Sequence, residues 1–333
     1  MIVILDTNIW ISDLALLSSV GSAVRQYLRL QNARLGLPEV IKLETEVGLR
    51  KALGDHIEKI QSSHRQLLTL FGRLKGVVLP SAEEVEGLIA DIFSKLGVEI
   101  EEIPFTLESA KASLERTIKK LPPSDKNEQF KDGVLWADCL TLLKKEAVFL
   151  VTSDKAFYKG RDLTRGLALE LKKEIADLPN ELKIFPSLTD LLSQIKTSMP
   201  FTEDVFVNTF TDNHGEKIGK LAANHSFAVE GDPLTKLQVF ATENPRLILV
   251  RFSLEYPCVD TSNEDRMAAK IIAQGEGTYD VDANKFSELA VREEQLRYRL
   301  PDGTEKILKN VVLIAGSIVI GHREVEHSVR YEL

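Results

Sequence analysis

The sequence predicts an α/β domain with a central parallel sheet, followed by a mostly β domain. Two short apolar runs, residues 2–5 and 147–151, predict strands that are buried on both faces of such a sheet. Each run is followed by polar residues that include an acid, Asp6 in the first case and Asp154 in the second. After residue 200, alternating apolar segments separated by turn signals predict the second, mostly β part.

The two acids indicate where the chemistry of the first domain is expected. In open α/β sheets, ligands bind outside the carboxyl ends of the strands. If the two strands are neighbours, Asp6 and Asp154 lie close together at one edge of the sheet. Like charges held close together both stay ionised only when a cation or a proton lies between them.

The elements between these strands follow from local signals. A helix is expected after Asn8, because acidic and polar residues come early in it and arginines late, as the helix dipole prefers. Residues 35–37 predict a brief second strand, and Pro38 is expected to start a helix, where its missing N–H costs nothing. Residues 50–121 are interpreted as a mostly helical insertion.

Two further acids fall on the apolar faces of expected helices. At 100° per residue, Glu44 is surrounded by an apolar stripe made of Leu37, Val40, Ile41 and Val47. In a helix expected over 130–145, Asp132 lies at the centre of the apolar stripe and near the positive N-terminal end. Asp138 lies at the edge of that stripe and is interpreted as structural or solvated. A buried carboxylate without a partner would be costly in free energy, so Glu44 and Asp132 are expected to have a partner or to hold a proton.

The remainder of the first domain is expected to contain a helix over 155–178 and a last strand over 182–185. Ser187 is expected to cap a helix over 188–195. Residues 197–200 are interpreted as a linker, which gives a first domain over 1–198 and a second over 201–333.

The second domain is predicted from alternation and turn residues. Alternating or apolar segments at 205–210, 237–240 and 247–254 predict strands, and residues 311–333 predict two more. One helix is expected around 263–274.

Composition favours a soluble protein of the reducing cytoplasm. The chain has 333 residues, which is enough for two domains with separate cores. Its two cysteines, Cys139 and Cys258, provide neither a disulfide framework nor a zinc ligand set. The apolar start is interrupted by Asp6 too early for a signal peptide, and the longest later apolar run is about half a membrane span.

Charge is distributed unevenly between the two domains. Residues 201–333 carry 15 Lys and Arg against 22 Asp and Glu, whereas the first 200 residues carry 27 against 28. An acidic β domain should repel phosphate backbones, so it is expected to serve assembly or partner binding. A local basic site in the first domain is compatible with its near-neutral balance.

The candidate site is therefore a set of four carboxylates: Asp6, Glu44, Asp132 and Asp154. No His or Cys joins them, and an all-carboxylate set suits hard cations such as Mg²⁺ or Mn²⁺ and not zinc. Such ions activate water and stabilise an in-line displacement at phosphorus. The pattern thus predicts a metal-dependent enzyme that acts on phosphate esters.

The order of these motifs resembles a PIN domain over residues 1–195. The resemblance rests on Asp6-Thr7-Asn8 after the first strand, Glu44 in a Pro-led helix, Asp132 opening a helix, and Thr152-Ser153-Asp154 after a strand. Its most specific portions are residues 131–136 and 151–157. The chain is more similar to the larger bacterial PIN-like proteins than to the small toxin ribonucleases, because the stretch between Glu44 and Asp132 is much longer here.

This resemblance implies a three-layer α/β/α fold and a metal-dependent nuclease, most often a ribonuclease, that hydrolyses phosphodiester bonds with metal-activated water. It implies that the four acids bind the ion and catalyse, with Asn8, Thr152 and Ser153 as supporting groups. RNA is favoured over DNA, and an endoribonuclease is the expected activity. Substrate phosphates are expected to meet Lys131 and Lys155, with further basic residues nearby: Arg116, Lys119, Lys120, Lys126, Lys159 and Arg161.

Two other functions remain open. A phosphatase of the haloacid dehalogenase type would use Asp6 as nucleophile, but that family expects a second acid where this chain has Asn8. A non-catalytic PIN-like module would bind a protein or nucleic-acid partner through the β domain. A homo-oligomer is a further expectation for either class.

Overall fold

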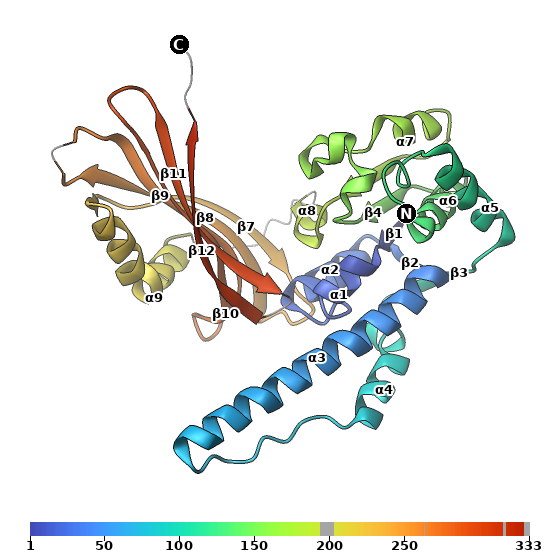
Figure 1. Ribbon diagram of the computed structural model, residues 1–333, viewed down its shortest axis with the longest axis horizontal. Helices are drawn as coiled ribbons and strands as arrows, with labels where there is room; N and C mark the ends of the chain where they lie inside the picture. The colour runs from blue at the N-terminus through green and yellow to red at the C-terminus, as the bar shows by residue number, and fades with distance from the viewer. Residues whose placement is uncertain (194–202, 263, 316–317, 330–333) are drawn as a thin grey trace. The chain divides into compact units, whose positions relative to one another are not determined.

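The computed structural model describes residues 1–193, 203–262, 264–315 and 318–329, with side chains as far as residue 309 (Figure 1). The chain divides into two compact units, Met1–Gln194 and Ile195–Leu333. Over the parts of the chain that are described, no helix is both long and apolar enough to cross a membrane. The linker expected at 197–200 lies outside the described residues.

The first unit is built on a five-stranded parallel sheet, as the sequence predicts. Its strands follow the order β3-β2-β1-β4-β5. They span Ile2–Leu5 (β1), Arg34–Pro38 (β2), Ile100–Ile103 (β3), Val148–Val151 (β4) and Leu182–Phe185 (β5). Leu5 pairs with Val151, so β1 and β4 are neighbours and end level with one another. The residues that follow these two strands therefore begin at the same edge of the sheet.

Helices flank this sheet, which confirms the predicted PIN-like α/β fold. They are α1 (Thr7–Ser12), α2 (Ser19–Leu30), α3 (Glu39–Phe71), α4 (Ala82–Asp91), α5 (Leu107–Lys119), α6 (Phe130–Leu143), α7 (Leu169–Glu174) and α8 (Leu188–Ser193). β1 is completely buried, and so are Trp10 and Trp136. Helix α6 packs against α5 and α3 and thus carries Asp132 into the interior of the unit.

The helix expected after Asn8 is in fact two helices. The chain turns between them, and Leu14, Ala15 and Leu16 all have positive φ angles. Ser18 then caps α2, since its hydroxyl accepts a hydrogen bond from the Gly21 amide at 3.0 Å. A Cβ atom at Gly21 would lie 2.4 Å from the Leu16 carbonyl, so the turn requires glycine at this position.

The helix expected over 155–178 is wrong. Three 3₁₀ turns replace most of it, at Lys155–Phe157, Lys159–Arg161 and Leu163–Arg165, and only α7 is α-helical. Gly160 and Gly166 both have positive φ angles, which stop a regular helix. Apolar residues in this segment pack into the core without helical periodicity.

The sequence interpretation also missed β3 within the mostly helical stretch 50–121. This strand pairs only with β2 and forms an edge of the sheet. Its central residues are charged, and Glu101 pairs with Arg34 while Glu102 pairs with Lys42. An edge strand with two acids lacks the apolar signature that identified β1 and β4.

The second unit is an antiparallel β structure with one helix in its described residues, α9 (Glu203–Asn224) (Figure 1). The main strand order is β12-β11-β10-β9-β8-β6, and β7 also pairs with β8. The strands are β6 (Phe227–Val229), β7 (Leu234–Ala241), β8 (Leu247–Asp260), β9 (Met267–Asp280), β10 (Lys285–Arg299), β11 (Glu305–Ala315) and β12 (Ile318–Val329). This confirms the β-rich second part and the two strands expected within 311–333.

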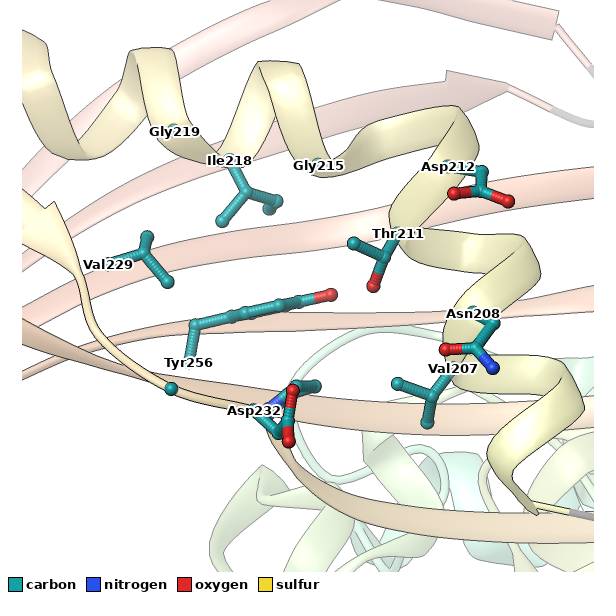
Figure 2. Close-up of a pocket in the computed structure, with 12 residues that line it drawn as sticks. Val207, Asn208, Thr211, Asp212, Gly215, Ile218, Gly219, Val229, Asp232 and Tyr256 are labelled. Carbon is teal, nitrogen blue, oxygen red and sulfur yellow. The ribbon is translucent and has the colours of Figure 1, made fainter.

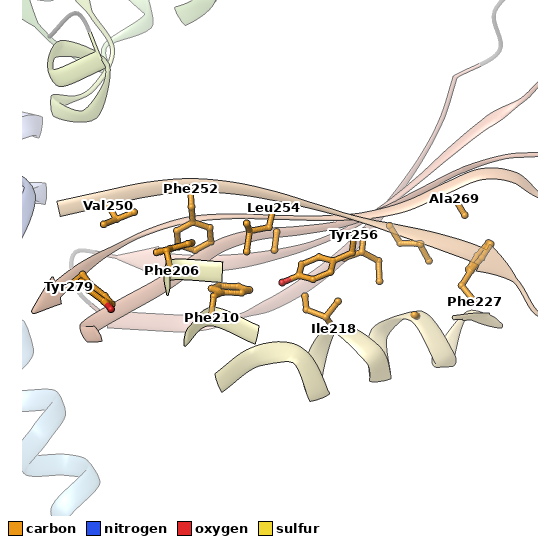
Figure 3. Close-up of a cluster of buried hydrophobic side chains, with 14 of the residues drawn as sticks. Phe206, Phe210, Ile218, Phe227, Val250, Phe252, Leu254, Tyr256, Ala269 and Tyr279 are labelled. Carbon is orange, nitrogen blue, oxygen red and sulfur yellow. The ribbon is translucent and has the colours of Figure 1, made fainter. Parts of the chain in front are cut away.

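Two element assignments in the second unit are wrong. Residues 205–210 belong to α9, because Phe206 and Phe210 lie one turn apart and both pack on the Phe252 ring, at 5.3 and 5.0 Å (Figure 3). The helix expected around 263–274 is strand β9 from Met267 onward; Asn263 lies outside the described residues. In β9, Ala269, Ile271 and Ala273 alternate into the same core.

A cavity of about 240 Å³ separates part of α9 from the sheet (Figure 2). Gly215 and Gly219 line it from the helix, and the Tyr256 ring lies across it from β8. A Cβ atom at Gly219 would meet no other atom within 4 Å, so the small residues of α9 leave this space open.

Candidate metal centre

Asp6 lies directly after β1 and is held by three hydrogen-bond donors. Its carboxylate accepts the Thr7 amide at 2.7 Å, the Asn8 side-chain amide at 2.8 Å and the Thr152 hydroxyl at 2.6 Å. The side chain is almost fully buried. Burial raises the pKa of Asp6, the three hydrogen bonds oppose this shift, and the charge of Asp154 adds to it.

Asp154 is fixed at the end of β4 by a matching set of contacts. It caps a 3₁₀ turn by accepting the Ala156 amide at 2.7 Å, and its other oxygen accepts the Gln129 side-chain amide at 2.8 Å. Thr152 links the two strand ends, since its hydroxyl donates to Asp6 and accepts the Asp154 amide at 3.0 Å. The Ser153 amide donates to the side-chain oxygen of Asn8 at 3.4 Å.

Asp132 joins these two acids from the first turn of α6. Burial raises the pKa of Asp132, and the negative charges of Asp6 and Asp154 raise it further. The nearby Asp154 carboxyl group thus favours the protonated form of Asp132. The structure thus brings together three of the four expected acids, which come from two strand ends and one helix.

Glu44 reaches the same region from α3 but is engaged by other groups. One oxygen accepts the Thr7 hydroxyl at 3.0 Å, and the other pairs with Lys131. These partners neighbour Asp6 and Asp132 in the sequence, so Glu44 lies beside the three acids. The buried face of α3 is centred on Ile41, Thr45 and Leu49, and Glu44 lies at its edge.

This position corrects the helical-wheel expectation, which placed Glu44 at the centre of the apolar stripe. Val47 is 64% exposed, although it was counted in that stripe. Helix α1 approaches α3 at Gly48, where a Cβ atom would lie 2.2 Å from the Ile11 side chain. Because α1 packs closely at Gly48, the buried face of α3 includes this side of the helix and leaves out Val47. Periodicity alone does not reveal such a contact.

The expected basic residues differ in their surroundings. Lys155 is exposed beside Asp154, whereas Lys131 pairs with Glu44. Lys119 pairs with Glu115 and Arg161 with Asp125. Arg116 is 8% exposed and donates to the Pro122 carbonyl and to both oxygens of Glu174. Arg116 therefore has a structural contact where a substrate contact was expected.

Replacing Arg116 by Gln should destabilise the protein strongly. The change removes a mostly buried ion pair and leaves Glu174, among the described residues, with the Trp136 indole N–H as its remaining donor. We therefore expect a loss of about 3 kcal/mol. The matched control is Lys119→Gln on the same helix, which breaks an exposed pair and should change stability little. Urea unfolding measures both, and equal effects would contradict this reading of Arg116.

Two groups at the centre were not anticipated from the sequence. Gln129 immediately precedes α6 and holds Asp154, and the Thr7 hydroxyl connects the first strand end to Glu44. Thr7 belongs to the Asp6-Thr7-Asn8 motif, but no role was predicted for it. Gln129 showed no periodic or spacing signal. Both depend on contacts between segments that are far apart in the chain.

The donor chemistry of the centre fits a hard divalent cation. All of its acidic groups offer oxygen atoms, and the charges of Asp6 and Asp154 raise the pKa of Asp132, a repulsion that a bound cation would compensate. Within the described residues, however, no group of three His, Cys, Asp or Glu side chains is arranged so that it could hold a metal ion. Glu44 would need to exchange its partner Lys131 before it could act as a fourth ligand.

Comparison with known families agrees with this geometry. Residues 3–157 match the family model described as a PIN domain, and the match includes Asp6, Glu44, Asp132 and Asp154. This part of the chain is therefore similar to PIN domains, a class whose members are generally nucleases that use divalent metal ions. Comparisons with curated proteins and with solved structures gave no match.

Proposed function

We propose that this protein is a Mg²⁺- or Mn²⁺-dependent nuclease, with RNA as the preferred substrate and endonucleolytic cleavage as its activity. The observation that supports this most is the convergence of Asp6, Asp132 and Asp154 at the carboxyl edge of β1 and β4. This is the edge at which parallel α/β sheets bind their ligands. The PIN-domain match over the same residues supports the same class of activity.

In this proposal, Asp6, Asp132 and Asp154 hold the ion, and Glu44 is the candidate fourth ligand. A bound divalent ion would lower the pKa of water and offset the charge that develops on the attacked phosphate. Asn8, Thr152 and Ser153 keep the acids oriented, since each takes part in the hydrogen bonds between the two strand ends. Gln129 has the same role for Asp154.

Substrate phosphates would approach from the side of Lys155, which is exposed next to Asp154. Lys131 has two candidate partners, the carboxylate of Glu44 and a phosphate oxygen of the substrate. If a substrate phosphate pairs with Lys131, Glu44 loses this partner and can bind the ion together with the other acids. The ion pair between Lys131 and Glu44 would then couple substrate binding to completion of the ligand set.

The experiment that tests this function compares labelled single-stranded RNA and DNA of one sequence, each with Mn²⁺ or with EDTA. We expect Mn²⁺-dependent internal cleavage, faster on RNA than on DNA. Cleavage that persists in EDTA would contradict the metal mechanism. Binding of RNA without cleavage at any Mn²⁺ concentration would favour the non-catalytic module instead.

We further propose that residues 1–198 carry this activity and that residues 201–333 serve assembly or partner binding. The first unit has a complete sheet and its own core, whereas the acidic charge lies in the second. A chain ending at Met199 should therefore fold and still cleave RNA with Mn²⁺, with a changed oligomeric state.

Cleavage assays and sedimentation of this shortened chain beside the full chain measure both effects. The control is isolated residues 201–333 in a nucleic-acid binding assay, where we expect no binding. A folded, metal-binding first unit that fails to bind RNA, together with a second unit that binds it, would reverse the assignment.

A further inference from the structure

Asp138 is a buried acid that the metal centre does not use. It lies in α6, six residues after Asp132, which corresponds to about 9 Å along the helix axis. Asp138 was interpreted as structural or solvated, and because the residue is only 5% exposed, the solvated alternative is wrong. Among the described residues, no hydrogen bond or ion pair to its carboxylate is found.

This acid lines a cavity of about 410 Å³, which we call the Asp138 cavity. The cavity lies between strand β3 with the segment that follows it, helix α5 and helix α6. Its apolar lining includes Ile103, Ala112 and Leu140, and Glu108 and Lys144 lie on its wall. A space of this size matches the lower range of small-molecule sites, which combine apolar walls with a few polar groups.

The Asp138 cavity is separate from the metal centre. None of the four acids proposed there lines it. The charges of Asp6 and Asp154 act on the pKa of Asp132, whereas burial is the cause that raises the pKa of Asp138, to about 7. The two acids also lie about 120° apart around α6, so they face different neighbours.

Two hydroxyl groups that line the cavity donate to other acceptors. The Thr141 hydroxyl donates to the Ala137 carbonyl at 3.1 Å, and the Ser109 hydroxyl donates to the Thr106 carbonyl at 3.0 Å. Buried polar groups in folded proteins normally have a partner, as Asp6 does three times over. Asp138 thus offers two acceptor oxygens to which none of the described residues donates a hydrogen bond.

The charges around the cavity indicate which donor fits. Glu101 and Glu102 on β3 pair with Arg34 and Lys42. Within the described residues, Glu108 and Asp138 are thus the acids of the lining without a cationic partner. Lys144 and Lys145, which directly follow α6, line the cavity as well and would repel a ligand with several positive charges. A cationic N–H donor forms the strongest hydrogen bonds to a carboxylate in apolar surroundings.

We propose that the Asp138 cavity binds a single alkyl ammonium or guanidinium group, which pairs with the Asp138 carboxylate. A free small amine or guanidine is one source of this group. A Lys or Arg side chain of a peptide is the other, because β3 leaves one edge of the sheet unpaired beside the cavity. The site is independent of the proposed nuclease activity.

The test is a calorimetric titration of the full chain in EDTA and without nucleic acid, using methylguanidinium, n-propylamine and a short capped peptide with one central Arg. We expect saturable one-to-one binding of at least one probe, with an affinity at least tenfold lower in Asp138→Asn. The exposed Asp91→Asn change is the matched control and should leave the affinity unchanged. n-Propanol, which has no charge, should not bind.

The probes distinguish the two sources. Affinity for the peptide at least tenfold above that for methylguanidinium would assign the site to a polypeptide side chain, and any smaller ratio would assign it to a free compound. Absence of saturable binding by all three charged probes would overturn the proposal. Equal affinity in the wild type and in Asp138→Asn would overturn it as well.

Stability against pH gives a second check that the carboxylate has no internal partner. Since the pKa of Asp138 is raised in the folded state, the folded protein binds this proton more tightly than the unfolded chain. The acid therefore destabilises the fold progressively as pH rises from about 4 to about 7. Asp138→Asn should raise the Tm at pH 8 and change it little at pH 4, whereas a lower Tm at pH 8 would show that the carboxylate has a partner and overturn the proposal.

Discussion

Replacing Asp6 by Asn should reduce the cleavage rate by about a thousandfold or more while leaving the protein folded. Loss of a metal ligand removes both water activation and charge compensation, and single catalytic contacts alone are worth a factor of about 10²–10³. The fold should survive, because Asn is the same size as Asp and removes a buried acid whose pKa burial already raises. Initial rates on labelled RNA at saturating Mn²⁺ measure the effect.

Asp91→Asn is the matched control for this change, since it neutralises an exposed acid that pairs with Lys95. It should keep the wild-type rate. A circular dichroism spectrum and a Tm at or above the wild-type value would show that Asp6→Asn is folded. Wild-type cleavage by folded Asp6→Asn would exclude this carboxylate from the reaction.

Mn²⁺ should raise the Tm of the wild-type protein by about 5–10 °C at roughly one hundred times its Kd. An ion that binds only the folded state at this concentration adds about 2.7 kcal/mol of stability. In a unit of this size, each kcal/mol shifts the Tm by roughly 2–4 °C. Thermal unfolding followed by tryptophan fluorescence reports on this unit directly, because Trp10 and Trp136 are buried in it.

Asp132→Asn should lose most of this Mn²⁺-dependent rise. The variant should also be more stable than the wild type in EDTA, because it removes a charge that burial, Asp6 and Asp154 all disfavour. Asp91→Asn again serves as the control and should show the full rise. A full Mn²⁺ response in Asp132→Asn would place the ion elsewhere in the protein.

The first unit could be predicted from its sequence where burial alone decides the structure. Strands β1 and β4 are buried on both faces, so continuous apolar runs identified them, and their parallel pairing follows from the α/β pattern. β3 was not predicted, because an edge strand tolerates charged residues such as Glu101 and Glu102. The helix expected over 155–178 failed because the positive φ angles at Gly160 and Gly166 override its apolar content.

The second unit shows the limit of short patterns. Residues 205–210 alternate as a strand would, yet Phe206 and Phe210 also suit one face of a helix, and the shared Phe252 contact selects the helix. The helix expected around 263–274 is largely strand β9, which pairs with β8 on one side and β10 on the other. Periodicity over about six residues cannot distinguish a helix from a strand unless the surface on which the segment packs is known.

The sequence placed the candidate acids at particular elements and said less about their surroundings. Asp6 and Asp154 follow from the strand ends, and Asp132 from the apolar stripe of α6. The Lys131 partner of Glu44 and the Gln129 contact to Asp154 arise from tertiary contacts that no local pattern encodes. For the same reason Asp138 looked like an edge residue, because the helices and strand that bury it come from a separate part of the chain.

The most direct measurement is the initial rate of RNA cleavage as Mn²⁺ is added back to metal-stripped protein, for the wild type and for Asp154→Asn. Asp154 contacts both Gln129 and Asp132, so its amide variant should change the ligand set and little else. We predict no cleavage before Mn²⁺ is added, a saturable rise in the wild type, and no rise in Asp154→Asn. Equal activation of both proteins, or cleavage by the metal-stripped wild type, would contradict a nuclease centre built from these carboxylates.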